Sequence, residues 1–429
     1  MGKNILLYVI LQYNFVVTVL FPNLITSSMK KIHLFTIFIC FFYSACSQPN
    51  QTSVQLKKDF FAKSTGKLPA LLYGLGDDRL GGAKMSYIDT GILFKVTDTS
   101  VSPWKVQMSK YRSAYVDKVY LKPDSAVKEK PYHLTANFRV YGTDSAYDVV
   151  TINMDEKLPY RAWMQTEPAA IQLEIFGVQS NTNWITQLPS TLKEIKNVYY
   201  RQSEEDVMLV TIELKHPAHW GYSINYNNNQ LVIKVKQQPK NLDVKNIKIA
   251  IDAGHGGTNS GAAGATTNIL EKAYTLLFAK QLQKYLKTKG VKNIFMTRES
   301  DTTLEMKDRI ISLQQNNPDL LISIHLNSNS DKEVKGCGTF YRHIGFRPVS
   351  QTILKRMKEI GLDEYGNVGS FNFGLSGPTD FVNCLLEVGF LSNINDEKKL
   401  ANPKFHTQTA AQIYKGIVDW LKDIQLGKY

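Results

Sequence analysis

The pattern of hydrophobic and polar positions divides the chain into two regimes. Between residues 68 and 240, short apolar runs rich in Val, Ile, Leu and aromatic residues are separated by Gly, Asp, Asn and Pro, which predicts strands joined by turns. The clearest of these runs are residues 91–96, 104–108, 113–116, 148–152, 171–175, 208–214 and 231–235. After residue 246, apolar runs alternate with longer segments of helical period, which predicts an α/β domain.

Within the second regime, three apolar runs are predicted strands: residues 247–251, 320–324 and 385–388. Two sets of residues recur at helical spacing: Tyr274, Leu277, Phe278, Leu282 and Tyr285, and near the end of the chain Ala410, Ile413, Tyr414, Ile417 and Leu421. The expected fold is an α/β domain over residues 246–429, with a mixed sheet flanked by helices. Two small all-β domains, residues 68–122 and 130–240, are expected to precede it.

The first 45 residues have the pattern of a leader. Met29, Lys30 and Lys31 precede an apolar run, residues 32–42, which small residues follow up to Cys46. This segment resembles a bacterial lipoprotein signal, which implies lipid attachment at Cys46 and a lipid-anchored tether over residues 46–67. The fit is better if translation starts at Met29, and an uncleaved anchor helix is the alternative.

Charge and cysteine content restrict the partners only partly. The net charge of +13 indicates an anionic partner, for which nucleic acid, anionic lipid and anionic wall polymer all qualify. Beyond the leader only Cys337 and Cys384 remain besides Cys46, and two cysteines make neither a disulfide framework nor a thiolate zinc site. Whether these two pair is left open by their spacing.

Three chemically capable residues stand at strand ends or inside a strand. His255 follows the first predicted strand within a glycine-rich turn, and His325 ends the second. Binding groups gather beyond the carboxyl ends of strands in open α/β sheets. Glu387 interrupts an apolar run, where a carboxylate is costly unless it is paired or bound to a metal. Each histidine alone is equally explained as a hydrogen-bonded core or turn residue.

Glu271 begins a predicted helix three residues after Asn268. Alone, this position is explained as well by a capping box, in which the glutamate side chain closes the helix start.

Four motifs together are more specific than any one residue. They are IAIDAGHGG at 249–257, LEK at 270–272, SIHLN at 323–327 and LEVGFLSN at 386–393. In this order they resemble the motifs of zinc-dependent N-acetylmuramoyl-L-alanine amidases, over about residues 246–425. The resemblance implies that His255, Glu271 and His325 bind one Zn²⁺, that Glu387 is the catalytic acid and base, and that the substrate is the bond joining N-acetylmuramic acid to L-alanine.

The chemistry of these residue types agrees with that resemblance. Two histidines and one carboxylate leave the fourth position of a tetrahedral zinc ion open for water, as catalytic sites require. A partly buried glutamate near the metal suits proton transfer. Arg298 and Asn327 are candidates for orienting ligands or substrate, although loop hydrogen bonding explains both equally. His343 and His406 match no motif position, and we expect neither to bind the metal.

The strand-rich regions carry weaker resemblances. Residues 68–122 are similar to bacterial Src-homology-like small barrels, and residues 130–240 resemble the AMIN domain found upstream of wall amidases. With the lipoprotein-like signal, these imply a periplasm-facing enzyme, lipid-anchored at the outer membrane, whose partners are peptidoglycan and the membrane rather than nucleic acid.

No long insertion separates His325 from Glu387, and the only candidate helix between them is residues 348–360. We therefore expect an open cleft that needs no activator protein. Residues 371–379 depart from the family pattern, because the usual arginine is missing there.

Two other functions are compatible with these residues. One is a noncatalytic wall-binding protein that keeps the fold, and the other is a zinc peptidase that cuts within the stem peptide. The products of peptidoglycan digestion distinguish them. Stem-peptide preference, oligomeric state and physiological role are not specified by the sequence.

Overall fold

The computed structural model describes residues 59–75, 84–143 and 146–428, and the chain divides into two units, residues 1–55 and 56–429. The expected leader, Cys46 and most of the expected tether lie outside the described residues. Within the described part, no helix combines the length and the apolar character needed to cross a membrane.

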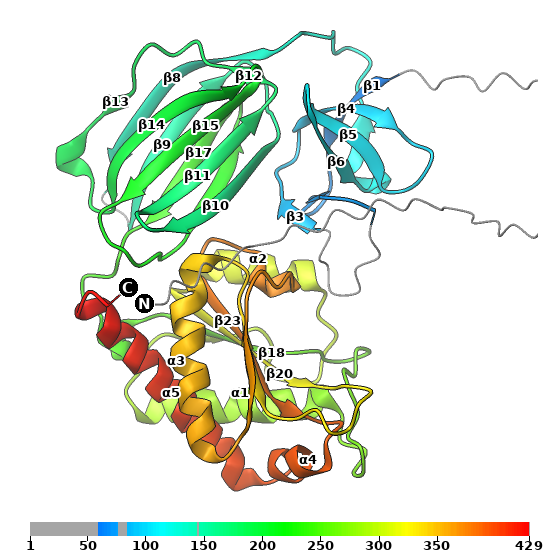
Figure 1. Cartoon of the computed structure of the whole chain (residues 1–429), viewed down its shortest axis with the longest axis vertical. Helices are drawn as coiled ribbons and strands as arrows, with labels where there is room; N and C mark the ends of the chain where they lie inside the picture. The colour runs from blue at the N-terminus through cyan, green and yellow to red at the C-terminus, as the bar shows by residue number, and fades with distance from the viewer. Residues whose placement is uncertain (1–58, 76–83, 144–145, 429) are drawn as a thin grey trace, which may run out of the picture. The chain divides into compact units, whose positions relative to one another are not determined.

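The first described region is a seven-stranded sheet with the order β3-β2-β6-β5-β4-β1-β7 (Figure 1). Its strands are β1 (Phe60–Ser64), β2 (Ala70–Leu72), β3 (Lys84–Tyr87), β4 (Leu93–Asp98), β5 (Trp104–Ser109), β6 (Arg112–Val116) and β7 (Leu121–Pro123). Strand β1 pairs with β4 although it lies inside the expected tether, so ordered structure begins earlier than predicted. Its five residues are too few to establish a period, and only pairing with β4 shows that this segment is a strand.

The next region contains a four-stranded sheet, β10-β11-β15-β14, and a six-stranded sheet, β12-β8-β9-β17-β16 with β13 beside β8. The strands are β8 (His133–Gly142), β9 (Tyr147–Met154), β10 (Tyr160–Thr166), β11 (Ala169–Phe176), β12 (Val178–Gln179), β13 (Thr186–Gln187), β14 (Ile195–Glu204), β15 (Val207–Leu214), β16 (Tyr222–Asn227) and β17 (Gln230–Lys236). All seven strand runs predicted before residue 240 are present. The region is all-strand, while its division into two domains stays a prediction.

The C-terminal domain is built on a mixed six-stranded sheet with the order β19-β18-β20-β23-β21-β22. Strands β19, β18, β20 and β23 are parallel, and β21 runs antiparallel to β23. Their bounds are β18 (Ile249–Ala253), β19 (Ile294–Met296), β20 (Leu320–Asn327), β21 (Cys337–Phe340), β22 (Glu364–Val368) and β23 (Val382–Phe390). The predicted mixed sheet is confirmed.

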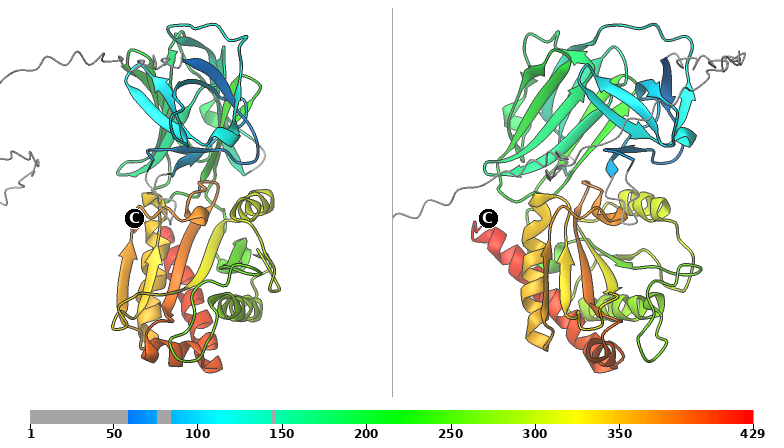
Figure 2. Two further views of the ribbon diagram at one scale, coloured as in Figure 1. Left: turned by 90° about the vertical axis from the view of Figure 1, so that its right-hand side faces the viewer. Right: turned by 45° about the vertical axis from the view of Figure 1, so that its right-hand side comes forward.

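Helices pack on both faces of this sheet (Figures 1 and 2). They are α1 (Glu271–Thr288), α2 (Met306–Asn316), α3 (Arg347–Met357), α4 (Ile394–Leu400) and α5 (Pro403–Gln425). Ala250 and Leu321 pack with Ile310 and Leu313 of α2, whereas their strand neighbours pack in the main core with α1 and α5. Because side chains alternate along a strand, the two clusters lie on opposite faces.

Two helix predictions differ in outcome. The apolar face predicted for the terminal helix is buried in α5, except that Tyr414 is half-buried. The helix predicted from the first set is present as α1, although Leu277 is 47% exposed and does not face the core. The buried positions are instead Glu271, Thr275, Phe278, Ala279, Leu282 and Leu286. The buried face of α1 therefore carries one charged and one polar residue besides its apolar residues.

Candidate metal centre

His255 lies two residues beyond the end of β18, in a sharply folded loop. Its φ is +61°, a conformation that residues other than glycine rarely adopt, and Gly256 and Gly257 follow with φ of +132° and +57°. Before it, a Cβ on Gly254 would lie 2.4 Å from Cε1 of His325. The glycines allow both the turn and the approach of the two imidazoles, whose ring centroids are 5.0 Å apart.

Arg309 of α2 forms hydrogen bonds with the backbone of this loop. It donates to the carboxylate of Asp252 at 2.7 Å, to the carbonyl of Ala253 at 2.8 Å and to the carbonyl of His255. Arg309 and Asp252 are both buried. The ion pair therefore fixes the backbone at the point where His255 takes its unusual conformation.

Arg298, a sequence candidate, is the second arginine under the loop. It is 3% exposed and donates to the carbonyls of Ala253 at 2.9 Å, Gly254 at 2.9 Å and Lys272 at 2.7 Å. These contacts tie the His255 loop to the first turn of α1. Of its two predicted roles, the geometry favours support of the ligand loop over contact with substrate.

Glu271 lies between the two histidines. Its Oε1 is 3.0 Å from Nε2 of His255 and 3.1 Å from Nδ1 of His325. The backbone N–H of Ala262 donates to Oε2 at 2.8 Å, and that of Leu326 donates to Oε1 at 3.0 Å. The carboxylate is thus held by the loop before α1 and by strand β20.

The start of α1 decides the alternative explanation of Glu271. The N-cap residue is Leu270, without a side-chain cap, and Asn268 stands outside the helix with a φ of +54°. Because the carboxylate of Glu271 faces the histidines, the capping box is not formed.

These three side chains fit a metal ion. One donor atom from each of His255, Glu271 and His325 lies within 4.8 Å of the other two, and this is the one such group among the described residues. Two imidazole nitrogens and a carboxylate oxygen form a donor set of catalytic zinc sites. The donor set agrees with the predicted ligands.

The orientation of His255 is set by a neighbour that sequence reasoning missed. Nδ1 of His255 is 2.9 Å from Oδ1 of Asn259. If Nδ1 carries the proton and donates to this oxygen, Nε2 keeps its lone pair toward Glu271, as a metal ligand requires. Asn259 has no distinguishing pattern in a glycine- and polar-rich loop, so only the fold identifies it.

Glu387 lies on β23 directly beside His325 of β20. It is 7% exposed, and its Oε2 has no hydrogen-bond partner among the described residues. Burial raises the pKa of Glu387, and the nearby charge of Glu271 raises it further. A carboxyl group whose pKa is raised in this way holds a proton more readily than an exposed one and can pass it on.

The side chains of Glu271 and His255 shift each other's pKa. Burial would raise the pKa of Glu271, but its interactions with His255 and His325 outweigh burial and hold the pKa well below its usual range. For His255, burial lowers the pKa and the interaction with Glu271 raises it. The interaction outweighs burial, so the pKa of His255 lies above its usual value. Since a ligating histidine must be neutral, metal binding here is expected to release protons.

The remaining sequence candidates have local roles or lie outside the described residues. Asn327 accepts the N–H of Ser328 at 2.8 Å through its side chain, which is the loop-bonding alternative. His343 and His406 bond to the carbonyls of Gly377 and Leu400 and do not join the metal group, as predicted. Cys46 is not among the described residues.

An aromatic side chain borders the site. Phe373, in the stretch that lacks the usual arginine, lies nearly parallel to the imidazole of His325 with ring centroids 6.4 Å apart. Phe371 and Phe340 pack beside Phe373. The stretch therefore places aromatic side chains next to His325.

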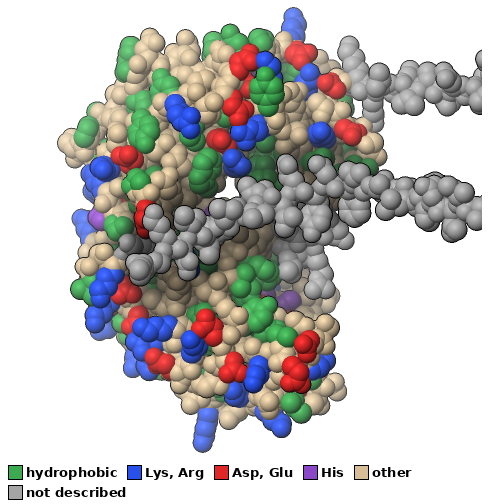
Figure 3. All heavy atoms as spheres, in the orientation of Figure 1, with side chains coloured by type: hydrophobic (Ala, Val, Ile, Leu, Met, Phe, Trp, Pro, Cys, Tyr) green, Lys and Arg blue, Asp and Glu red, His purple; other side chains and the backbone are tan. Residues whose placement is uncertain are grey.

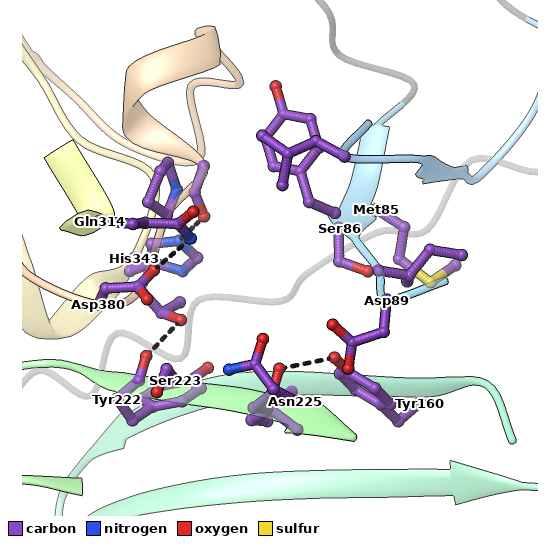
Figure 4. A pocket seen from close by; sticks show the side chains of 18 residues that line it. Met85, Ser86, Asp89, Tyr160, Tyr222, Ser223, Asn225, Gln314, His343 and Asp380 are labelled. Carbon is purple, nitrogen blue, oxygen red and sulfur yellow. Dashed lines mark hydrogen bonds between the residues drawn. The ribbon is translucent and has the colours of Figure 1, made fainter. Parts of the chain in front are cut away.

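A separate cavity of about 120 Å³ lies elsewhere in the unit 56–429 (Figure 4). Its lining includes Asp89, Tyr222, Gln314 and Asp380, and Gln314 donates to Asp380 at 3.2 Å. None of the four predicted catalytic-site residues lines it. Cys337 and Cys384, whose pairing the sequence left open, are not bonded to each other and are both buried.

Comparison with known proteins identifies the matching family. Residues 249–419 match the family model described as N-acetylmuramoyl-L-alanine amidase. A probable cell wall amidase, LytH of Staphylococcus saprophyticus, is 28% identical over 252 residues, which cover 58% of this chain and 78% of that protein. The germination-specific N-acetylmuramoyl-L-alanine amidase of Bacillus subtilis is 29% identical over 204 residues, 43% of this chain and 84% of that protein.

Among solved structures, the catalytic domain of CwlV, an N-acetylmuramoyl-L-alanine amidase from Bacillus (Paenibacillus) polymyxa, is 31% identical. It covers 41% of this chain and 98% of its own, with a TM-score of 0.39.

Proposed function

We propose that a zinc ion held by His255, Glu271 and His325 is the catalytic metal of this N-acetylmuramoyl-L-alanine amidase. It is a peptidoglycan hydrolase that cleaves the amide bond between N-acetylmuramic acid and the L-alanine of the stem peptide. One observation carries the mechanistic proposal: donor atoms of His255, Glu271 and His325 converge beside a buried glutamate, Glu387, whose Oε2 has no hydrogen-bond partner in the described part of the chain.

The donor set supports zinc as the metal. Imidazole suits zinc, and a His/His/Glu set leaves a position open for water and substrate. When bound, zinc would lower the pKa of water toward about 7 and polarise the scissile carbonyl. His255 and His325 contribute neutral nitrogens, and the ionised Glu271 offsets part of the charge of the cation.

Glu387 is the proton carrier in this proposal. Its burial and its position beside His325 suit a carboxylate that takes the proton of the attacking water and then donates it to the leaving amine of L-alanine. The amine leaves as a neutral group only if it gains this proton. Glu387 therefore acts first as a base and then as an acid.

The test is digestion of purified peptidoglycan followed by mass spectrometry. Free L-alanine amino termini and glycan strands without peptides are expected. Glu387→Gln should lower kcat by about 10²–10⁴-fold while zinc remains bound. Glu299→Gln, at an exposed position, is the matched control. Cleavage inside the stem peptide would support the peptidase alternative, and full activity of Glu387→Gln would refute the assignment of the acid and base.

We also propose that the enzyme acts outside the cytoplasm as a lipoprotein anchored through Cys46, facing the periplasm at the outer membrane. The support is the lipoprotein-like segment ending at Cys46 and the relatives named as cell wall amidases. Cys46→Ser should move the protein from the membrane fraction to the soluble fraction. Equal membrane retention of Cys46→Ser would contradict lipid attachment.

Peptidoglycan, rather than nucleic acid, is the proposed polymeric partner. On the face in Figure 3, acidic and basic side chains are interspersed rather than gathered into one basic band. The barrel-like and AMIN-like regions would bind the wall and keep the catalytic domain near its substrate. Binding of residues 47–240 to purified peptidoglycan tests this.

An open cleft without an activator is the last part of the proposal. Helix α3, the candidate covering helix, buries Val349, Ile353 and Met357 against the sheet and α5, as a packing helix does. Zinc-loaded enzyme should therefore digest peptidoglycan at a rate that an added envelope extract leaves unchanged. A large stimulation by the extract would contradict this.

A further inference from the structure

Helix α4 begins shortly after β23, the strand of Glu387. It carries two adjacent buried carboxylates, Asp396 and Glu397, which are 2% and 0% exposed. The helix is labelled at the foot of Figure 1. Asn393 caps it, because its side chain accepts the N–H groups of Asn395 and Asp396. A charged group inside a protein is costly unless hydrogen bonds satisfy it, so the partners of these two carboxylates are informative.

Glu397 is bound entirely by one loop. The N–H of Thr266 lies 3.0 Å from its Oε2, and the hydroxyl of Thr266 donates to the same oxygen at 2.6 Å. The N–H of Thr267 donates to Oε1 at 3.0 Å, and the hydroxyl of Thr267 donates to Oε1 as well. Four donors from two consecutive residues thus surround one carboxylate.

The shape of the loop is adapted to this contact. A Cβ on Gly264 would lie 2.1 Å from Oε1 of Glu397, so only glycine lets the carboxylate approach this closely. The neighbouring N–H of Ala265 donates at 3.0 Å to the carbonyl of Leu391, which directly follows β23. The loop tip is therefore fastened at two points to the segment that continues the strand of Glu387.

The base of the same loop contacts the carboxylate of Glu271, the proposed metal ligand. Residues 256–270 connect His255 to Glu271, and Ala262 both donates its N–H to Oε2 of Glu271 and accepts the N–H of Glu271. Gly261 has a φ of +66°, and a Cβ there would lie 2.4 Å from Oε2 of Glu271. A displaced loop tip would move the groups that orient Glu271.

We propose that Glu397 is a positioning residue for the metal site, which fastens the loop 256–270 and thereby holds Glu271 in place to bind the metal. This inference rests on the proposed metal site. It adds a residue that forms hydrogen bonds with Thr266 and Thr267 and acts on Glu271 through the loop.

Asp396 provides a matched control on the same helix. Its carboxylate accepts the N–H of Gly336 at 2.7 Å and that of Phe390 at 3.1 Å, which lie outside the loop 256–270. Loss of Asp396 removes a buried carboxylate of similar exposure but leaves the Thr266 and Thr267 contacts intact. Comparing substitutions at Asp396 and Glu397 therefore distinguishes a general loss of stability from a displaced loop.

The experiment compares Glu397→Gln, Thr267→Val and Asp396→Asn in the full chain. Zinc affinity is measured by competition with a chelator, amide hydrogen exchange at Thr266 and Thr267 by mass spectrometry, and thermal stability by calorimetry. Glu397→Gln should weaken zinc binding about tenfold and speed exchange at both amides, because an amide side chain offers a donor where four donors converge. Thr267→Val, a milder change, should do the same to a smaller extent.

Asp396→Asn should lower thermal stability but leave zinc affinity within about threefold of the wild type. Unchanged zinc affinity and exchange in Glu397→Gln would overturn the inference, and so would an equal loss of affinity in Asp396→Asn. If the wild type itself fails to bind zinc, the proposed function fails, and hydrogen exchange still reports whether Glu397 orders the loop.

Discussion

His255 and His325 face the same carboxylate, but they are held in differently built parts of the domain. His325 belongs to β20, whose backbone is paired on both sides with β18 and β23. His255 stands outside the sheet with a positive φ, and the arginine side chains beneath its loop bond to its carbonyl and to those of its neighbours. One ligand thus depends on the backbone ladder and the other on side-chain contacts, so single substitutions should affect His255 more.

The largest effect should come from Arg309→Met, which removes the support on the His255 side. The buried Asp252 would lose its arginine partner, and a broken buried ion pair costs about 3–5 kcal/mol of unfolding free energy. Urea denaturation measures this, and zinc affinity should fall as well. Arg356→Met is the control, because the pair of Arg356 with Asp419 lies near the surface and should contribute at most about 1 kcal/mol. Equal losses in the two variants would contradict the comparison.

A third histidine, the buried His219, should make the protein less stable in acid. Burial lowers the pKa of His219 to about 4, so the folded state keeps this side chain neutral while the unfolded state takes up a proton below its ordinary value of about 6.5. The stabilising contribution is present above pH 6.5 and is lost as the pH falls toward 4. By pH 5 the loss should be about 2 kcal/mol.

Chemical denaturation of the metal-free protein from pH 7 to pH 5 measures this loss. His219→Gln should flatten the pH dependence. A wild-type protein that became more stable over this range would show that the neutral buried histidine is assigned wrongly.

Asn259→Ala sharpens the comparison at the ligand itself. Without its partner at Nδ1, His255 loses the hydrogen bond that orients its ring, and zinc affinity should fall about tenfold. Thermal stability should change little, because the residue lies in a surface loop. Zinc affinity is measured by chelator competition. An affinity equal to that of the wild type would show that Asn259 does not orient His255.

The smallest effect is expected on the His325 side. Ser323 of β20 donates to Asp252 at 2.8 Å, and Ser323→Ala leaves that carboxylate bonded to Arg309 and Thr297. The expected loss is about 1 kcal/mol, with zinc affinity within about twofold of the wild type, because the β ladder still holds His325. If zinc affinity fell as far as in Arg309→Met, the strand would not be the stable support that the comparison assumes.

Predictability differed among the site residues for physical reasons. His255 follows a predicted strand, His325 lies in the last part of another, and Glu387 lies inside an apolar run, all of which are visible in local patterns. Glu271 was ambiguous, because its position also suited a helix cap. The start of α1 excludes that cap, and the role of Glu271 as a metal ligand stays a prediction.

The supporting residues were harder to find. Arg309 lies 54 residues from His255, and Glu397 lies 131 residues from Thr266, so no local pattern pairs them. Leu277 shares the helical spacing of its neighbours but is exposed, because the buried face of α1 includes Glu271 and Thr275, which apolar residues alone do not mark.

The sequence by itself determined the alternation of strands and helices after residue 246, the all-strand character of the region before it, and the four residues of the candidate site. These depend on short-range periodicity and on motifs contiguous in the chain. Only the tertiary structure decided that Arg298 supports the ligand loop, that Glu271 faces the histidines rather than its helix end, and that Asn259, Arg309 and Glu397 belong to the support. Those roles depend on which donors and carboxylates meet after distant segments fold together, and the local periodicity of the chain does not encode such meetings.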